Sequence, residues 1–173
     1  LQNAIDWMMR LNRAAAQAMQ QVNVKCATDV TGYALLGHAH EIAQASGVAL
    51  RFRADALPIL DGALEYAHKK QIPGGAGRNK LYLEGKVKFE KELGGDLSEI
   101  LFDPQTSGGL LIAVSSPNAD RLARRCWLTR SQKKSLWHWK TLIPAPAGRV
   151  WHYCERPELT SIETSASVWL ITM

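Results

Sequence analysis

The stretch KCATDVTGYALLGH, residues 25–38, predicts a strand, a turn and the start of a helix. Residues 25–30 are the expected strand. Thr31 and Gly32 supply the hydroxyl and the conformational freedom typical of a helix start. Apolar residues then recur at helical spacing as far as Gly47, which is a natural C-cap. Asp29 is therefore expected at the carboxyl end of a strand, directly before a helix N-terminus.

A carboxylate at that position has two interpretations. It can cap the following helix, which is the commoner use of an acid there. It can also hold a cation against a phosphate, because exposed N–H groups and the helix dipole favour anions at a helix N-terminus. The spacing around Asp29 leaves both roles open.

A second motif, FDPQTSGGLLI, occupies residues 102–112. Its glycine pair precedes a continuous apolar strand over residues 110–114, and such a pair lets another backbone approach closely. Thr106 and Ser107 offer hydroxyl groups that could bind phosphate. A structural turn that links two layers explains the same residues equally well.

The pattern of apolar residues over the rest of the chain predicts an α+β fold. We expect a mixed sheet with flanking helices in three layers, an α/β/α arrangement. Residues 72–77 are rich in glycine but lack the ending of a P-loop, so a mobile loop is expected there. The helices are predicted at 1–21, 32–46, 58–71 and from 117 to about 125, and a half-buried strand at 48–54.

Composition limits the class of protein. The 173 residues suffice for one domain with a core, and no apolar run is long enough to cross a membrane. No secretion signal is recognisable, and the three cysteines are widely spaced without a CxxC pair, which favours a reducing cytoplasm. The chain lacks an initiator Met and begins within a predicted helix, which indicates a fragment.

The last part of the chain differs from the rest in charge. Residues 121–173 carry nine Lys or Arg and three acids, and they hold five of the six tryptophans. We therefore expect a domain over residues 1–125 and an atypical tail over 126–173. The tail is either the product of a frameshift or a true extension that binds something acidic. The basic residues at 78, 80, 86 and 88 share their span with Glu84, Glu90 and Glu92, which argues against a nucleic-acid surface.

The two motifs together resemble the C-terminal half of selenophosphate synthetase (selenide, water dikinase). The resemblance rests on TDVTG-x-x-LLGH at 28–38 and on FDPQTSGGLLI at 102–112. Ser46-Gly47-Val48, Ala56-Leu57-Pro58, Pro73-Gly74-Gly75 and Asn79 lie between them in the family's order. It covers about residues 11–122, and Tyr33-Ala34 replaces the usual Phe-Gly.

The resemblance implies a homodimeric enzyme of two α/β domains that converts ATP, selenide and water to selenophosphate, AMP and phosphate with Mg²⁺. Its fold is that of the aminoimidazole ribonucleotide synthetase C-terminal domain. The nucleophile and most metal ligands belong to the N-terminal half, so this chain holds no catalytic residue and is expected to be inactive alone. Cys26 is not in the position of the family's nucleophile.

The resemblance assigns site residues to the positions of this sequence that match the family's motifs. Asp29 matches the family's metal-binding acid of the first motif. Thr31, Gly32, Thr106 and Ser107 are candidates for contacts to the nucleotide. Two alternatives remain: a stand-alone or decayed domain that binds a nucleotide or partner without turnover, and another ATP-using enzyme of the same superfamily.

Overall fold

The computed structural model describes residues 2–54, 57–90, 92–128, 137–140, 142–144 and 166–171. The helices are α1 (Gln2–Met8), α2 (Arg13–Gln21), α3 (Ala34–Ser46), α4 (Ala63–His68), α5 (Gly74–Tyr82), α6 (Gly95–Leu101) and α7 (Ser116–Leu128). The strands are β1 (Cys26–Asp29), β2 (Val48–Leu50), β3 (Leu110–Ser115), β4 (Trp137–Lys140), β5 (Leu142–Pro144) and β6 (Ala166–Ile171).

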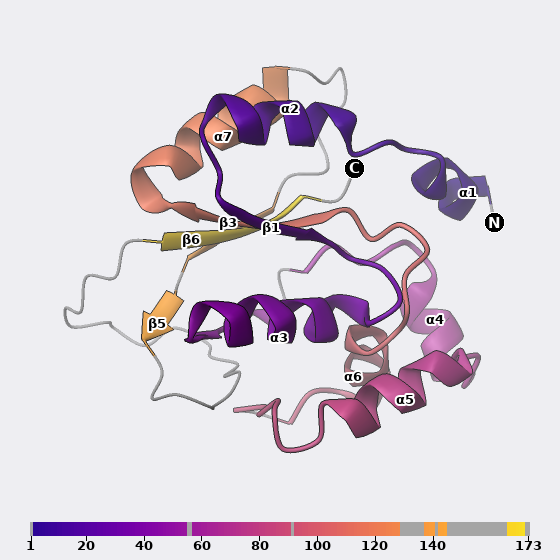
Figure 1. The fold of residues 1–173 in the computed structure, drawn as a ribbon. Helices are drawn as coiled ribbons and strands as arrows, with labels where there is room; N and C mark the ends of the chain where they lie inside the picture. Colours follow the sequence, from indigo (N-terminus) through magenta and orange to yellow (C-terminus); the bar gives the residue numbers. More distant parts are fainter. Residues whose placement is uncertain are drawn as a thin grey trace.

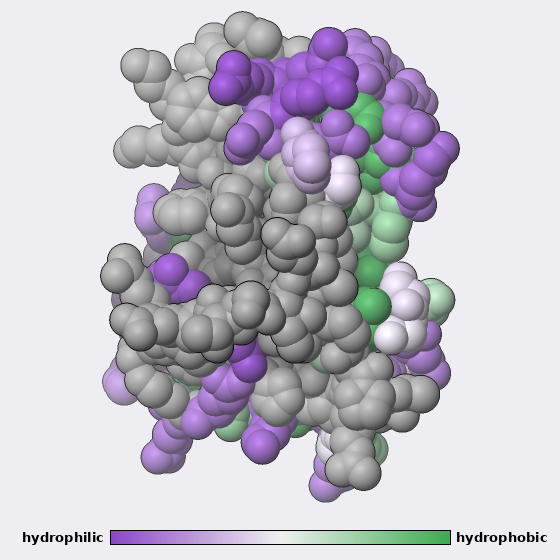
Figure 2. Space-filling model, turned by 90° about the vertical axis from the view of Figure 1, so that its left-hand side faces the viewer, coloured by the Kyte–Doolittle hydropathy of each residue, from purple (hydrophilic) through white to green (hydrophobic). Residues whose placement is uncertain are grey.

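Three layers are visible in Figure 1. Helices α2 and α7 lie side by side on one face of the sheet, and α3 covers the other face, with α5 and α6 beyond it. The outer surface of the α2 and α7 layer is largely hydrophilic in the upper part of Figure 2. The predicted α+β class and its three layers are confirmed.

The sheet departs from the prediction in one respect. We expected a mixed sheet, whereas the described strand pairs are all antiparallel: β1 with β3, β3 with β6, β4 with β6, and separately β2 with β5. The reason lies in the two motifs. The first motif follows the carboxyl end of β1 and the second precedes the amino end of β3, so they can meet only if these strands run in opposite directions.

Strand β3 is the centre of the core. Ile112 and Val114 point to α2 and α7, where they pack with residues such as Ala18 and Leu122. Leu111 faces the opposite way and packs with Ala39 and other residues of α3. A strand that is apolar on both faces is typical of a sheet covered on both sides. This explains the continuous apolar run in the sequence.

The predicted helix over residues 1–21 is wrong in its continuity. The chain forms α1 and α2, separated by residues 9–12, and Asn12 is the N-cap of α2. The apolar stripe continues in the sequence, but Met9 and Leu11 are 75% and 70% exposed. Because packing of the apolar face supplies most helical stability, the unpacked segment does not stay helical.

Two further boundaries differ. The helix expected over 58–71 spans only Ala63–His68, because Gly62 adopts φ 85° directly before it and ends the preceding irregular segment. The glycine-rich segment expected as a mobile loop instead begins α5 at Gly74, after Pro73 in an extended conformation. Ala76 and Leu83 are buried against α3 and α6, and this packing offsets the poor helix propensity of the glycines.

Part of the atypical tail joins the sheets. Strand β6 pairs with β3 along its whole length, and β5 pairs with β2. Helix α7 continues to Leu128, past the proposed boundary at residue 125. The boundary and the two explanations of the tail stay predictions, and most of the tail lies outside the described residues. Among those that are described, no helix combines the length and apolar character needed to span a membrane.

The role of β3 gives a stability prediction. Leu111 is fully buried, so Leu111→Ala should lower the free energy of unfolding by about 2–5 kcal/mol through lost burial and the cavity left behind. Leu81, which is 73% exposed on α5, is the matched control. Leu81→Ala should change the free energy of unfolding by less than about 0.5 kcal/mol. Urea unfolding of both variants measures the difference, and equal midpoints would contradict the central role of β3.

Candidate functional site

The two motifs meet and are joined by backbone hydrogen bonds. Val30 N–H donates to the Gly109 carbonyl and Gly108 N–H donates to the Val30 carbonyl, both at 2.9 Å. Gln105 N–H donates to the Thr31 carbonyl at 3.0 Å. These bonds extend the ladder between β1 and β3 into the loops that follow and precede the strands. The prediction that the glycine pair permits a close backbone approach is confirmed.

Gly108 shows how close that approach is. A Cβ atom at this position would lie 2.8 Å from the Val30 carbonyl oxygen and 2.9 Å from Val30 Cγ1. Side chains essentially never tolerate such distances to backbone atoms. The first motif therefore packs directly onto the backbone of the second.

Asn79 fastens the same junction from α5. Its side chain is buried, and Nδ2 donates to the Gly32 carbonyl at 3.1 Å and to the Phe102 carbonyl at 3.0 Å. One amide group thus satisfies a carbonyl from each motif. An amide is suited to this task because its two N–H donors point in different directions.

His38 holds the turn of the first motif to α3. Its Nδ1 lies 3.0 Å from Glu41 Oε2, and its Nε2 lies 3.1 Å from Thr31 Oγ1. A carboxylate only accepts, so in the neutral imidazole the proton is on Nδ1 and the Thr31 hydroxyl donates to Nε2. His38 is 7% exposed, and the Tyr33 ring contacts its ring edge-on, with centroids 5.6 Å apart.

The Thr31 bond corrects the predicted helix start. Helix α3 begins at Ala34 with Tyr33 as N-cap, and no side-chain cap hydrogen bond is present there. Ala34 has φ 63°, so the chain turns sharply before the helix. Thr31 therefore does not cap α3, because its hydroxyl is directed to His38.

Asp29 lies at the end of β1, as predicted from the sequence, and it is exposed. Mg²⁺ favours carboxylate ligands, and an accessible carboxylate at a strand end is suited to contribute one ligand to a Mg²⁺ site. In the described part of the chain, no group of three or more His, Cys, Asp or Glu side chains could hold a metal ion. Asp29 can thus complete a metal site but does not build one with its neighbours.

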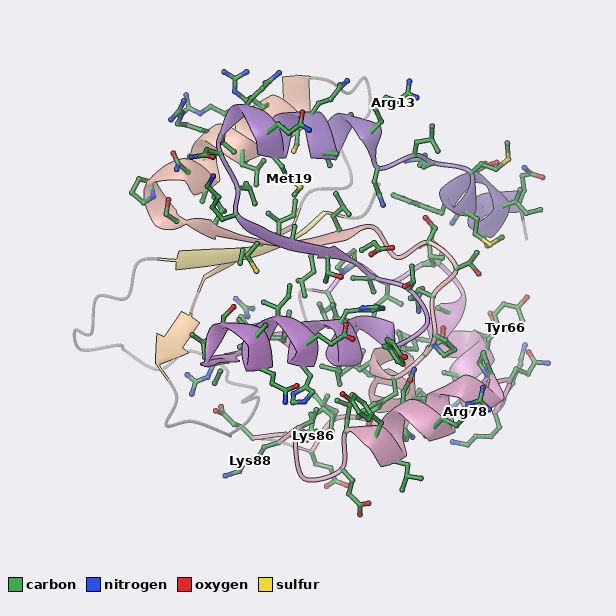
Figure 3. All side chains as sticks on the ribbon, viewed as in Figure 1. Arg13, Met19, Tyr66, Arg78, Lys86 and Lys88 are labelled. Carbon is green, nitrogen blue, oxygen red and sulfur yellow. The ribbon has the colours of Figure 1, made fainter. Side chains whose placement is uncertain are left out.

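A cavity of about 820 Å³ opens beside the junction of the motifs. Its polar wall is the second motif, including Asp103, Gln105, Ser107 and Gly108, and Val30 of the first motif also contributes. Apolar residues from the segment before α4 and from the segment before α5 line the other side. Figure 3 shows Tyr66, another lining residue, projecting from α4 on the side of the molecule where α1 lies.

Asp103 is the unusual polar group of this cavity. Its Oδ2 accepts a hydrogen bond from Gln105 Nε2 at 3.1 Å, while its Oδ1 is buried without a hydrogen-bond partner. Burial raises the pKa of the Asp103 carboxyl above its ordinary value, and the hydrogen bond from Gln105 opposes this to a smaller extent. The structure thus isolates one carboxylate oxygen from both water and protein donors.

The predicted nucleotide contacts are only partly brought together. Ser107 lines the cavity, whereas Thr106 is exposed and absent from its lining. Thr31 and Gly32 lie at the junction, where the Gly32 carbonyl accepts from Asn79. Their role in nucleotide binding stays a prediction. Sequence reasoning assigned no role to Asn79, Asp103 or the His38–Glu41 pair. The i, i+3 spacing of His38 and Glu41 on one helix is a usable signal, whereas Asn79 and Asp103 lie among glycine and polar residues that give none.

Comparison with known proteins places this site in context. Residues 4–127 match the family described as AIR synthase related protein, C-terminal domain. The chain is 48% identical over 124 residues to the selenide, water dikinase of Caldanaerobacter subterraneus subsp. tengcongensis, which covers 70% of this chain and 35% of that protein. It is 39% identical over 120 residues to the enzyme of that name from Clostridioides difficile, covering 69% of this chain and 34% of that protein.

A third relative is the selenide, water dikinase of Geobacter metallireducens, with 44% identity over 117 residues, 68% of this chain and 34% of that protein. The chain therefore spans about a third of the length of these curated relatives.

Asn79 generates a prediction about the junction. Asn79→Ala leaves the Gly32 and Phe102 carbonyls unsatisfied and should cost about 1–3 kcal/mol of unfolding free energy. Asn118, which bonds an arginine on the surface of α7, is the matched control, and Asn118→Ala should cost less than about 0.5 kcal/mol. Urea denaturation compares the two, and a loss at Asn79 no greater than at Asn118 would rule out the fastening role.

Asp103 generates a prediction about pH. A carboxyl with a raised pKa binds its proton more tightly in the folded state, so its contribution to stability is greatest below the ordinary pKa of 3.8 and declines as pH rises through the folded pKa. The stability of Asp103→Asn relative to the parent chain should therefore increase as pH rises above 3.8. Urea midpoints across this range measure it, with Asp120→Asn on α7 as a charge control. A relative stability that falls with pH would contradict the assignment.

Proposed function

The chain belongs to the AIR synthase related family, C-terminal domain, and we propose that it is the C-terminal domain of a selenophosphate synthetase. The complete enzyme would convert ATP, selenide and water to selenophosphate, AMP and phosphate. The observation that carries this proposal is the direct junction of the two motifs, which the sequence pattern links to that enzyme. The identity of 48% to a protein named selenide, water dikinase supports the same choice within the family.

The chemistry assigns this domain a supporting role. Phosphoryl transfer depends mainly on positioning and on neutralising charge. Mg²⁺, when bound, supplies that neutralisation at the nucleotide phosphates. The exposed Asp29 carboxylate at the end of β1 offers one ligand to it, and the nucleotide and the rest of the enzyme would supply the others.

The remaining features of the function follow from this assignment. We expect ATP and selenide as substrates, a homodimer, a cytoplasmic location and no nucleic-acid partner. The chain alone should not turn over ATP, because it spans only about a third of the length of its relatives, and in the described residues no group of three or more His, Cys, Asp or Glu side chains could hold a metal ion. Two alternatives remain: a non-catalytic domain and another ATP-using enzyme. The substrate dependence of a reconstituted enzyme distinguishes them from the proposed function.

A hybrid enzyme tests the function. The part of the Caldanaerobacter enzyme that precedes the matched segment is joined to the whole of this chain, and AMP release is followed with and without selenide. Selenide-dependent AMP release supports the proposal. A folded hybrid that binds ATP without turnover supports the non-catalytic alternative, and turnover independent of selenide supports another ATP-using enzyme.

Asp29 is tested in the same hybrid. Asp29→Asn should lower turnover by more than about 100-fold, since loss of a direct ligand exceeds the 10–100-fold typical of changes behind the ligands. Because the side chain is exposed, the urea midpoint should stay unchanged. Binding of Mn²⁺, followed by its electron paramagnetic resonance, should weaken in parallel. Asp120→Asn is the control, and equal Mn²⁺ binding by both variants would remove Asp29 from the metal site.

A further inference from the structure

Three side chains of the first motif and α3 form a hydrogen-bonded series that the proposed function does not use. Thr31 Oγ1 lies 3.1 Å from His38 Nε2, and His38 Nδ1 lies 3.0 Å from Glu41 Oε2. Because the carboxylate can only accept, it holds the Nδ1 proton of the neutral imidazole, and Nε2 is left as an acceptor for the Thr31 hydroxyl. The order of hydroxyl, imidazole and carboxylate is that of a nucleophile, its base and the group that orients the base.

The hydroxyl and the imidazole of this series are held in place by the fold. The Thr31 carbonyl accepts hydrogen bonds from Ala34 N–H and Gln105 N–H, both at 3.0 Å, so the backbone that carries the hydroxyl is fixed. His38 is buried, and the Tyr33 ring contacts its imidazole edge-on. A nucleophile and a base that are positioned in advance avoid much of the entropic cost of bringing them together.

The turn that follows Thr31 is open to a small molecule. Thr31 is half-buried, and Gly32 is exposed. A Cβ atom on Gly32 would meet no heavy atom within 4 Å apart from its neighbours in the chain. In the part of the chain that the structure describes, neither Gly32 N–H nor Tyr33 N–H donates to a backbone carbonyl. The N–H that follows a nucleophile is a common donor to the oxyanion that forms on attack, so these two groups are available for that role.

The charges near Thr31 favour a neutral acyl donor. Asp29, two residues earlier in the sequence, and Glu41 are both exposed acids. Without a bound cation, their negative charges disfavour the approach of an anionic phosphoryl donor. An activated carboxylic ester is neutral and is not repelled. An aryl leaving group can in addition pack against the Tyr33 ring, since Tyr33 is 56% exposed.

We propose that Thr31 Oγ1 is a nucleophile that accepts an acyl group from neutral activated esters, with His38 as its base and Glu41 as the group that orients His38. In this step the hydroxyl proton passes to His38 Nε2 while Oγ1 forms a bond to the ester carbonyl carbon. The bond from that carbon to the leaving oxygen then breaks, and the proton on Nε2 passes to the leaving oxygen. The products are O-acyl-Thr31 and an alcohol or phenol. This activity goes beyond the proposed function, because it requires neither ATP nor selenide.

Acetylation of the whole 173-residue chain by p-nitrophenyl acetate tests the inference. Absorbance follows the release of p-nitrophenol, and mass spectrometry of peptides locates the acetyl groups. Treatment with hydroxylamine removes acetyl groups from threonine esters and leaves those on lysine amides. Thr31 should be acetylated at least about 100-fold faster than Thr106, an exposed threonine of the second motif, because assistance by a general base contributes about 10²–10⁴-fold.

His38→Gln separates the chemistry from a structural role. The glutamine amide oxygen can still accept the hydrogen bond from the Thr31 hydroxyl, but it cannot take the proton. Acetylation of Thr31 should therefore fall at least about 100-fold, while circular dichroism shows that the variant is folded. His40→Gln changes the other histidine of α3 and is the matched control, which should keep the parent rate.

Two results would overturn the inference. One is a hydroxylamine-sensitive acetyl group that forms on Thr31 no faster than on Thr106, and the other is a folded His38→Gln variant that is acetylated at the parent rate. If His38→Gln does not fold, the comparison of Thr31 with Thr106 in the parent chain decides the question. An active hybrid enzyme with an unreactive Thr31 rejects this inference alone, and a reactive Thr31 with an inactive hybrid rejects only the proposed function.

Discussion

The hydrogen bonds that join Val30 and Thr31 to Gly109, Gly108 and Gln105 are the constraint on which the rest of the structure depends. They fix the antiparallel direction of β1 and β3, and they place the turn before α3 against the loop before β3. The absence of a Cβ at Gly108 makes this contact possible. Every candidate functional group described above lies within a few residues of these bonds or is held by them.

The junction has a structural side and a side that faces ligands. Asn79 and His38 lie on the structural side, where they satisfy the Gly32 carbonyl and the Thr31 hydroxyl within the protein. Asp29 is exposed, and Asp103 lines the cavity, with its Oδ2 bonded to Gln105. This division shows that neighbouring polar residues of one motif serve different purposes: Thr31 and His38 bond each other and hold the turn in place, whereas the Asp29 carboxylate is exposed.

The sequence allowed the strand–turn–helix unit, the strand over 110–114 and the close approach at the glycine pair to be predicted, because each depends on local pattern. The predictions from the sequence failed where packing between residues distant in the sequence determines the local structure. The break after Met8 follows from a segment with nothing to pack on, and α5 forms through a glycine-rich turn because α3 and α6 bury it. Asn79 could not be assigned a role, since its partners Gly32 and Phe102 are 47 and 23 residues away in the sequence. The burial of Asp103 depends on the cavity, which the sequence does not show.

The two halves of the site are contributed by residues near 30 and near 105, and helices α3 to α6 with strand β2 lie between them in the sequence. Closing so long a loop has an entropic cost, which must be met before the non-local contacts of the junction compensate for it. Helices α3 and α5 can form from nearby residues, but the site itself arises only when the chain between the motifs has collapsed around β3. Ligand binding therefore reports completed folding: a chain that has acquired its helices but has not paired β1 with β3 has secondary structure and no site.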